Sequence, residues 1–392
     1  MLKGKITFWR VVLALLLILG AYSTILRFLH GLGASTNLSD AFPWGLWIGF
    51  DVMCGVMLAS GGFTLTAAVY IFNLKNFKPI VRPAILTAFL GYLLVVVALF
   101  FDLGRGYRIW HPLVMWNPRS VMFEVAWCVT LYTTVLSLEF SGAIFEHLKL
   151  TKLVRLQHSI VVPLVIAGVM LSTLHQSSLG SLYLIVPNKL HTFWYTPLLP
   201  VLFFLSAICV GIAMTIFESS MSARHFDKQL EMPLLRGLGR ALLVVLGVYT
   251  VVRFEDLIDR HVLHLVSKGG SEAGLFLLEM LLCSVAPMIL LMIPRVRESA
   301  NGLYLASVLC LLGFVTNRMN VAITGMEASA GQHYFPKWTE IVVTFAIVGF
   351  GFLVFALAVR YLPIFRHGAE PQSILQAEVG QDEVPELSNA GP

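Results

Sequence analysis

Long apolar runs separated by short polar stretches make up most of this 392-residue chain. A helix that crosses the hydrocarbon core of a bilayer needs about 20 predominantly apolar residues. Runs of about that length or longer lie at residues 11–29, 44–72, 83–101, 121–145, 159–180, 197–217, 238–258, 273–293, 302–320 and 339–361. The pattern predicts an all-α polytopic membrane protein with about ten transmembrane helices.

The composition agrees with a protein that lies mostly in the membrane. Hydrophobic residues make up 57% of the chain and charged residues only 12%, whereas soluble domains carry about 25% charged residues. The first run follows Lys3, Lys5 and Arg10 but lacks a clear small-residue cleavage site, so we interpret it as a span and not as a signal peptide. The net charge of +5 comes from loop lysines and arginines and gives no indication of nucleic-acid binding.

The distribution of basic residues predicts the orientation. Lysine and arginine gather at the N-terminus and in alternate loops, at Lys75, Lys78, Arg82, Lys149, Lys152, Arg155, Arg224, Lys228, Arg236, Arg240, Arg295, Arg297 and Arg366. Loops next to spans carry an excess of these residues on the cytoplasmic side, so both termini are expected in the cytoplasm. Residues 367–392 carry five acidic residues and no lysine or arginine, and we expect them to form a disordered cytoplasmic tail.

Short sequence matches are consistent with a parallel internal repeat. Residues 123–128 and 278–283 each hold a Glu followed four residues later by a Cys, and residues 101–105 resemble 254–260. Such short matches also arise by chance. With a duplication, residues 1–366 form one membrane domain with a first helix at 11–29, a bundle at 44–180, a second bundle at 197–320 and a last helix at 339–361.

Charged and hydrogen-bonding residues inside the spans are the main functional signal. An ionised side chain at the bilayer centre costs about 2.5–3.5 kcal/mol on insertion scales, so a group of them marks a candidate site. Most lie toward the outer end of the predicted helices, at Asp51, Asp102, Arg105, Glu124, His175, Gln176, Ser178, Arg253, Asp256, Glu279 and Arg318. The structural alternative is that these charges pair with one another and hold helices together.

Acidic residues also continue toward the inner end. Glu139 lies on the same predicted helix as Glu124, and Glu218 lies at the inner end of the sixth span. Together with Glu279, these acids are the predicted members of a sparse proton path.

A site of this composition suits a quinone. Reduction of a quinone delivers protons to two carbonyl oxygens, so each end of the ring needs a proton donor that can be resupplied. Histidine titrates near neutrality and can shuttle protons, and a carboxyl group can act as general acid. His175 and Glu124 are therefore the first candidates for quinone protonation, and Asp51 is the third.

The electrons must come from another protein. The five cysteines are scattered singly in the spans, so no iron–sulfur cluster or structural metal is expected in this chain. A b-type haem needs facing histidines within the helices. His175 is the clearly intramembrane histidine, and His158 lies about 25 Å from it along the same helix, so we predict no haem.

Several motifs resemble the NrfD/polysulfide reductase family of membrane subunits, most closely the HybB-type subunit of nickel–iron hydrogenase. They are Ala41-Phe42-Pro43-Trp44-Gly45-Leu46-Trp47-Ile48-Gly49-Phe50-Asp51, Val81-Arg82-Pro83-Ala84, Phe123-Glu124, Leu138-Glu139-Phe140, His175-Gln176-Ser177-Ser178-Leu179-Gly180-Ser181-Leu182, Ile216-Phe217-Glu218, Arg253-Phe254 and Tyr334-Phe335-Pro336-Lys337-Trp338. Each motif is weak alone, and together they cover nearly all of the membrane portion.

The resemblance implies two four-helix bundles in the bacterial inner membrane and menaquinone bound near the periplasmic face. It also implies a periplasmic ferredoxin-like iron–sulfur subunit that relays electrons from the large and small hydrogenase subunits. Asp51, Glu124, His175 and Glu218 match family positions associated with the quinone and with proton movement. Gln176, Ser178, Asp102, Arg105, Arg253 and Arg318 are the further predicted quinone-site residues.

Three other functions stay open from the sequence. The family also serves molybdenum reductases and multihaem cytochromes, so the catalytic partner is not fixed by the resemblance. A proton-coupled secondary transporter would also carry buried carboxylates, but it would favour broken helices and a site near the membrane midplane. A passive membrane anchor would use the charges only as structural pairs.

Overall fold

A computed structural model describes residues 8–225 and 230–364, which consist of helices and connecting loops without any strand. This confirms the predicted all-α class. The predicted acidic tail at 367–392 lies outside the described residues.

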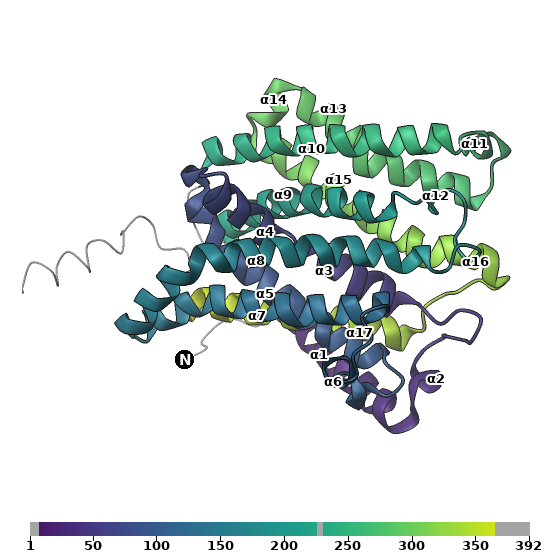
Figure 1. The fold of residues 1–392 in the computed structure, drawn as a ribbon, viewed down its shortest axis with the longest axis horizontal. Helices are drawn as coiled ribbons and strands as arrows, with labels where there is room; N and C mark the ends of the chain where they lie inside the picture. The colour runs from purple at the N-terminus through teal and green to yellow at the C-terminus, as the bar shows by residue number, and fades with distance from the viewer. Residues whose placement is uncertain (1–7, 226–229, 365–392) are drawn as a thin grey trace, which may run out of the picture.

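The long helices form the body of the molecule (Figure 1). They are α1 (Phe8–His30), α5 (Lys78–Asp102), α7 (Val121–His147), α8 (Thr151–Leu184), α9 (Leu199–His225), α10 (Met232–Asp259), α12 (Ser271–Met280), α15 (Ala300–Met319) and α17 (Trp338–Tyr361). The shorter segments are α2 (Leu32–Ser35), α3 (Gly55–Leu58), α4 (Gly61–Thr66), α6 (His111–Val114), α11 (His264–Lys268), α13 (Ala286–Met292), α14 (Pro294–Arg297), α16 (Gly325–Ala330), η3 (Lys75–Phe77) and η4 (Gly106–Arg108).

Three apolar spans contain π-helical turns. The second span runs from Trp47 to Ile71 and includes the π-helices η1 (Trp47–Cys54) and η2 (Ala67–Ile71). The others are η5 (Leu281–Val285), between α12 and α13, and η6 (Asn320–Thr324), between α15 and α16. π-Helical turns are rare and frequently occur at functional sites. Here they lie within, or directly after, segments that carry buried polar residues.

Within the described residues, nine helices are long and apolar enough to cross a membrane. They match nine of the ten expected spans. The tenth expected span corresponds to α10, which is 28 residues long and packs against α9. α10 carries Arg236, Arg240, Arg253, Glu255, Asp256 and Asp259 and is not one of the nine.

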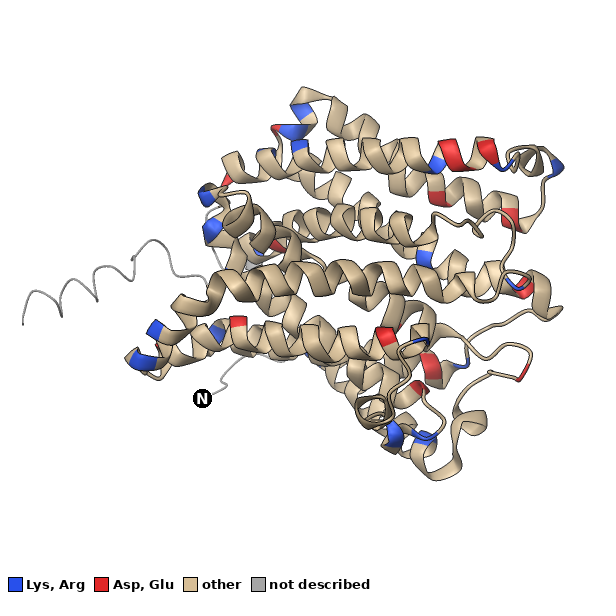
Figure 2. Ribbon diagram, in the orientation of Figure 1, with Lys and Arg blue, Asp and Glu red and all other residues tan. Residues whose placement is uncertain are grey.

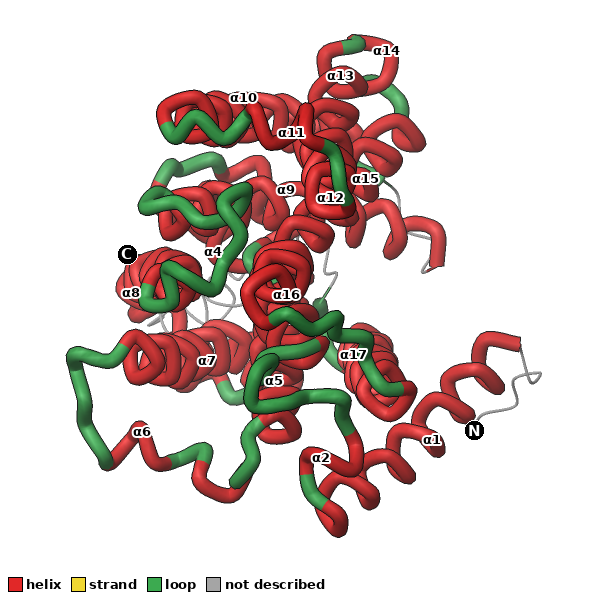
Figure 3. Tube along the Cα trace, turned by 90° about the vertical axis from the view of Figure 1, so that its right-hand side faces the viewer, coloured by secondary structure: helices red, strands yellow, loops and turns green. Residues whose placement is uncertain are grey.

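The helices pack as neighbours in a layered bundle. α7 lies against α5 and α8, α8 lies against α9, and α9 contacts both α10 and α15. α1 packs against α17, which in turn packs against α5. The view from one end shows α1 and α17 together at one side of the molecule (Figure 3). The second span contacts α5, α9 and α15. It is the most buried of the candidate spans, because 78% of the residues in its apolar 18-residue stretch are buried inside the protein.

Charged residues lie mainly toward the two ends of the helices, as the coloured ribbon of Figure 2 shows. At the end where α1 begins, Arg82 forms a two-bond ion pair with Glu146, at 2.5 and 2.9 Å. At the opposite end lie α2, α6, α11 and α16 (Figure 1). The candidate residues of the outer end lie toward this second end.

Candidate functional site

His175 is fully buried on α8, where it faces α5. Its Nδ1 atom lies 2.9 Å from the hydroxyl of Tyr92. In the part of the chain that the structure describes, Nε2 has no hydrogen-bond partner. Buried polar atoms in proteins are nearly always hydrogen-bonded to protein or ordered water. If Tyr92 donates to Nδ1, then Nε2 carries the ring proton and can donate it to a ligand oxygen.

The residues that follow on α8 extend this polar site. Gln176 is also fully buried and donates from Nε2 to the carbonyl oxygen of Val56, at 3.2 Å, while its Oε1 atom finds no partner among the described residues. One turn beyond His175, the Ser178 hydroxyl donates to the carboxyl group of Glu124 at 2.6 Å. Glu124 lies in the first turn of α7 and is exposed. The site therefore extends from a buried histidine to a carboxylate at the protein surface.

Asp51 and Asp102 form a second polar group. Asp51 is buried in η1 and accepts a 2.7 Å hydrogen bond from Thr344 on α17. Asp102, at the end of α5, lies close enough to Asp51 for repulsion and close enough to Arg27 on α1 for attraction. Arg27 donates to two backbone carbonyl groups at the end of α5, each at 2.8 Å. Arg105 lies beyond the end of α5 and is exposed.

Glu340 ties the start of α17 to this end of the molecule. Its carboxyl group accepts hydrogen bonds from the backbone nitrogens of Asn37, at 2.8 Å, and Lys337, at 3.0 Å, and from the Tyr334 hydroxyl. The same hydroxyl accepts a 2.9 Å hydrogen bond from the backbone nitrogen of Leu46. Burial, followed by the hydrogen bond to Glu340, raises the pKa of Tyr334. The contacts fasten α17 beside η1, where Thr344 meets Asp51.

Glu279 lies in a third polar group, in the half of the molecule formed by α9, α10, α12 and α15. It is fully buried. Its carboxyl group accepts hydrogen bonds from Trp194 at 2.8 Å, from Asn317 at 2.7 Å and from Asn320 at 2.9 Å. All three donors are neutral, so hydrogen bonds satisfy the carboxyl group without a direct ion pair.

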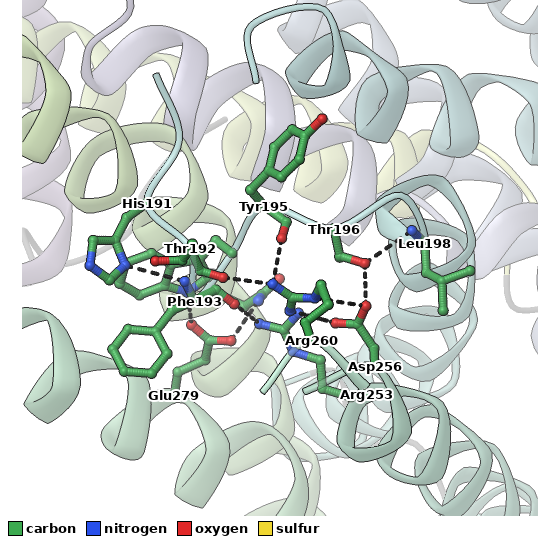
Figure 4. A network of polar contacts seen from close by, with 12 residues as sticks. His191, Thr192, Phe193, Tyr195, Thr196, Leu198, Arg253, Asp256, Arg260 and Glu279 are labelled. Atoms are coloured by element: carbon green, nitrogen blue, oxygen red, sulfur yellow. Dashed lines mark hydrogen bonds and ion pairs between the residues drawn. The ribbon is translucent and has the colours of Figure 1, made fainter. Parts of the chain in front are cut away.

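The loop between α8 and α9 is fastened to α10 (Figure 4). Arg253 donates to the carbonyl oxygen of Phe193 at 3.0 Å. Arg260 donates to two further loop carbonyls at 2.7 Å and forms a two-bond ion pair with Asp256, at 2.6 and 3.0 Å. Asp256 also accepts a hydrogen bond from Thr196, whereas Arg253 lies 3.9 Å from the same carboxylate. The acid next to Asp256, Glu255, is exposed.

Arg318 is buried on α15 beside Phe203 of α9. Its guanidinium group lies 3.4 Å from the centre of the Phe203 ring and donates to Ser206 at 2.7 Å. It also donates to the Phe203 carbonyl oxygen at 3.2 Å and to Asn317 at 3.3 Å. Asn317 thus connects Arg318 to the carboxylate of Glu279.

The acids expected on the inner side take different positions. Glu139 is buried on α7. Glu218 is half-buried on α9, close to Thr87 of α5. Glu146, at the end of α7, is held by its ion pair with Arg82. The structure thus has separate acids on α7 and α9 toward this end.

A family comparison matches this chain over most of its length. The model of the family described as "Polysulphide reductase, NrfD" matches residues 34–329. The chain belongs to the polysulphide reductase NrfD family.

Three relatives of this NrfD-family chain cover most of its length. A protein of Nitratidesulfovibrio vulgaris is 40% identical over 92% of this chain and 95% of its own length. The probable Ni/Fe-hydrogenase 2 b-type cytochrome subunit of Escherichia coli is 33% identical over 86% of this chain and 87% of its own. The menaquinone reductase integral membrane subunit of Nitratidesulfovibrio vulgaris is 30% identical over 90% of both chains.

The structure places the predicted residues of this NrfD chain in several groups. His175 and Gln176 are neighbours on α8, and Ser178 joins the same helix to Glu124. Asp51 and Asp102 share a group with Arg27 and Thr344. The third group contains Arg253, Asp256, Glu279 and Arg318, whose hydrogen bonds are made mainly to the α8–α9 loop, α9 and α15. Arg105 stands apart.

Several site residues of this NrfD chain were not predicted. Tyr92 was missed because a single tyrosine within an apolar run looks like ordinary helix packing. Trp194 and Glu340 lie in or next to loops, where polar and aromatic residues are common. Arg27 carried a usable signal, since an arginine near the end of the first apolar run is costly unless it has a partner.

Proposed function

We propose that the chain is the quinone-reactive integral membrane subunit of a respiratory nickel–iron hydrogenase complex. It passes electrons from a periplasmic iron–sulfur subunit to menaquinone, with linked proton transfer. The supporting observation is the unpartnered Nε2 atom of the buried His175, in the region of α8 where Ser178 binds the exposed carboxylate of Glu124.

The residues fit a quinone in their hydrogen-bonding chemistry. A quinone supplies two carbonyl oxygens that accept hydrogen bonds and take up protons on reduction. His175 Nε2 can donate to one of them, and Glu124 is a carboxyl group that can hold and return a proton near the other. In this proposal Asp51, Gln176 and Ser178 shape the site. Asp102, Arg105, Arg253 and Arg318, which lie outside the His175 group, act on it at longer range.

The names of relatives support a quinone-linked role and an oxidoreductase partner. One is named as a menaquinone reductase integral membrane subunit, and another as a Ni/Fe-hydrogenase 2 subunit. Two further relatives, at 24% and 25% identity, are named as a subunit of selenate reductase and as a putative membrane subunit of dimethyl sulfoxide reductase. The quinone role is therefore the broader proposal, and hydrogenase is the specific catalytic partner that we propose.

The proposal includes an electron supply from outside the chain. No haem and no iron–sulfur cluster are assigned to it, so electrons enter from a periplasmic ferredoxin-like subunit next to the large and small hydrogenase subunits. The chain lies in the bacterial inner membrane with both termini in the cytoplasm and the quinone site near the periplasmic side. Glu139, Glu218 and Glu279 are the proposed acids of proton movement, together with Glu124.

The test is to purify the intact complex from native membranes and identify its subunits. Hydrogen-dependent menaquinone reduction is then measured in the variants His175→Ala and Glu124→Gln. Loss of a positioned proton donor lowers turnover by about a hundredfold or more, so both variants should be strongly impaired at normal complex yield. Glu255→Gln, which changes an exposed acid of α10, is the matched control.

Each outcome addresses a different part of the proposal. Full activity in both site variants removes the quinone site. Copurification with a molybdenum enzyme or a multihaem cytochrome in place of hydrogenase subunits removes the hydrogenase assignment but keeps the quinone role. A b-haem absorbance bound to this chain overturns the proposed electron path.

A further inference from the structure

Three buried hydroxyl groups lie next to His175 and have no role in the function proposed above. Tyr92 and Tyr132 are fully buried on α5 and α7, and their rings meet edge to face with centroids 4.7 Å apart. Ser172 is buried on α8, one turn before His175. Its hydroxyl lies near both tyrosine hydroxyls but outside the geometry of a direct hydrogen bond. The three hydroxyls therefore form one cluster that ends at His175.

The cluster is short of hydrogen-bond partners. Across residues 8–225 and 230–364, neither the Ser172 hydroxyl nor the Tyr132 hydroxyl has a partner within hydrogen-bond geometry. An unsatisfied buried hydroxyl costs about 1–3 kcal/mol. Buried water commonly supplies the missing bonds where several polar groups converge. The Ser172 and Tyr132 hydroxyls, next to Tyr92 on the Nδ1 side of His175, therefore point to bound water between them.

The cluster also reaches Glu139 on the inner side. Tyr132 and Glu139 are seven residues apart on α7, so they share one face and lie about 10 Å apart along the helix axis. Both approach Gly168 of α8. A Cβ atom at that glycine would lie 3.5 Å from the Tyr132 ring and 3.8 Å from a carboxyl oxygen of Glu139. The Val135 side chain also approaches this position, at 3.4 Å, so the glycine leaves a small space that borders the phenol ring, the carboxyl group and an apolar side chain.

We propose that Tyr132, Ser172 and Tyr92, bridged by buried water, form a proton relay from Glu139 to His175. This inference rests on the proposed function, because it supplies the proton that His175 gives up there. Hydroxyl groups suit such a relay because each can donate one hydrogen bond and accept another while remaining neutral. No net charge has to stay between the carboxyl group and the imidazole, where it would be costly in the apolar bundle.

The relay moves one proton at a time from Glu139 to His175. When Nε2 of His175 loses a proton to the ligand, Nδ1 takes the proton of the Tyr92 hydroxyl. Tyr92 takes a proton from Ser172 or from a bridging water, and the chain of transfers ends at the carboxyl group of Glu139. One proton leaves Glu139 for each proton that leaves His175. Glu139 then takes up a new proton from the inner side. No electron passes through the relay.

Isosteric tyrosine variants test the relay. Tyr132→Phe and Tyr92→Phe remove only a hydroxyl, and we expect turnover of the purified complex to fall about tenfold or more, with KM for the quinone unchanged. Tyr183→Phe is the matched control. Tyr183 is equally buried on α8, and its hydroxyl already has a partner in Met53, at 3.1 Å. We expect it to keep turnover within about twofold, as for a hydroxyl outside the relay.

A structural readout separates the relay from simple packing. In a high-resolution structure of the intact complex, we expect ordered water within hydrogen-bond distance of the Ser172 and Tyr132 hydroxyls, and loss of that water in Tyr132→Phe. A dry cluster overturns the relay.

Activity then distinguishes this inference from the function on which it rests. If Tyr132→Phe and Tyr92→Phe both retain full turnover while His175→Ala is inactive, the relay is wrong and the quinone site stands. If His175→Ala is fully active, the proposed function fails first.

Discussion

Glu279 shows at the scale of one residue how a carboxylate is kept inside an apolar bundle. Its two oxygens accept three hydrogen bonds from Trp194, Asn317 and Asn320, and the side chain is fully buried. Hydrogen bonds to charged groups contribute about 1.5–3 kcal/mol each. Through Asn317 the carboxylate is also connected to Arg318. These hydrogen bonds therefore explain why an acid can be buried at this position. Glu279 has this structural role whether or not it takes part in proton movement.

Replacing this acid tests the structural role. Glu279→Gln keeps the side-chain volume but places an amide donor among three donors, so one or more of them loses its acceptor. We expect the free energy of unfolding to fall by about 2 kcal/mol or more. Thermal unfolding of the detergent-solubilised protein measures the change, with Glu255→Gln as the exposed control. Unchanged stability together with lost proton transfer would instead favour a role in the proton path.

At the scale of one element, α8 determines the position of the His175 site. The helix runs over 34 residues, from Thr151 to Leu184, which corresponds to about 51 Å, longer than a hydrocarbon core of about 30 Å. The apolar pattern predicted a span at 159–180, because the polar first turns of the helix resemble a loop in a hydropathy profile. Near its other end, α8 meets the start of α9 at Gly180.

Gly180 is the tightest point of this helix contact. A Cβ atom there would lie 2.8 Å from both the carbonyl oxygen of Leu199 and the nitrogen of Pro200, which are backbone atoms that cannot rotate away. Gly180→Ala should therefore destabilise the protein by about 1–3 kcal/mol. Gly247→Ala in α10 meets no atom within 4 Å and is the control; it should be neutral or slightly stabilising. Equal melting temperatures for the two variants would contradict the tight contact.

At the scale of the whole molecule, the sequence predicted the class and the number of long helices well. Hydropathy reports burial in lipid, so spans of twenty or more apolar residues are visible without knowledge of their neighbours. The free-energy cost of ionisable side chains inside a membrane also singled out Asp51, His175 and Glu279, and all three are buried.

The partners of these residues were not predictable, because they depend on which helices meet. Tyr92 reaches His175 from another helix, 83 positions away in the sequence. Similarly, the sequence placed Asp102 and Arg105 three residues apart at the end of one predicted span. The helix ends at Asp102, so Arg105 lies beyond it and is exposed, and the arginine near Asp102 is Arg27 of α1, which donates to the backbone carbonyls on either side of it.

The orientation of the molecule can be tested by chemical labelling. All five native cysteines are buried, so a cysteine introduced at an exposed position near either end of the molecule should dominate the reaction with a membrane-impermeant maleimide. We expect Ser267→Cys, in α11, to be labelled in intact spheroplasts. Lys152→Cys, at the opposite end in α8, should be labelled only after the membrane is opened. The reverse pattern would contradict the proposed location of both termini in the cytoplasm.

The unpartnered atoms around His175 also link the binding of a molecule at this site to the stability of the fold. The Nε2 atom of His175, the Oε1 atom of Gln176 and the hydroxyls of Tyr132 and Ser172 find no partner among the described residues. Each such atom lowers the free energy of unfolding by about 1–3 kcal/mol relative to a satisfied one. A molecule that supplies the missing bonds binds the folded chain and not the unfolded one, so by linkage it stabilises the fold. The bundle alone is thus less stable than one with these atoms satisfied, and a bound molecule that supplies the missing hydrogen bonds restores that stability.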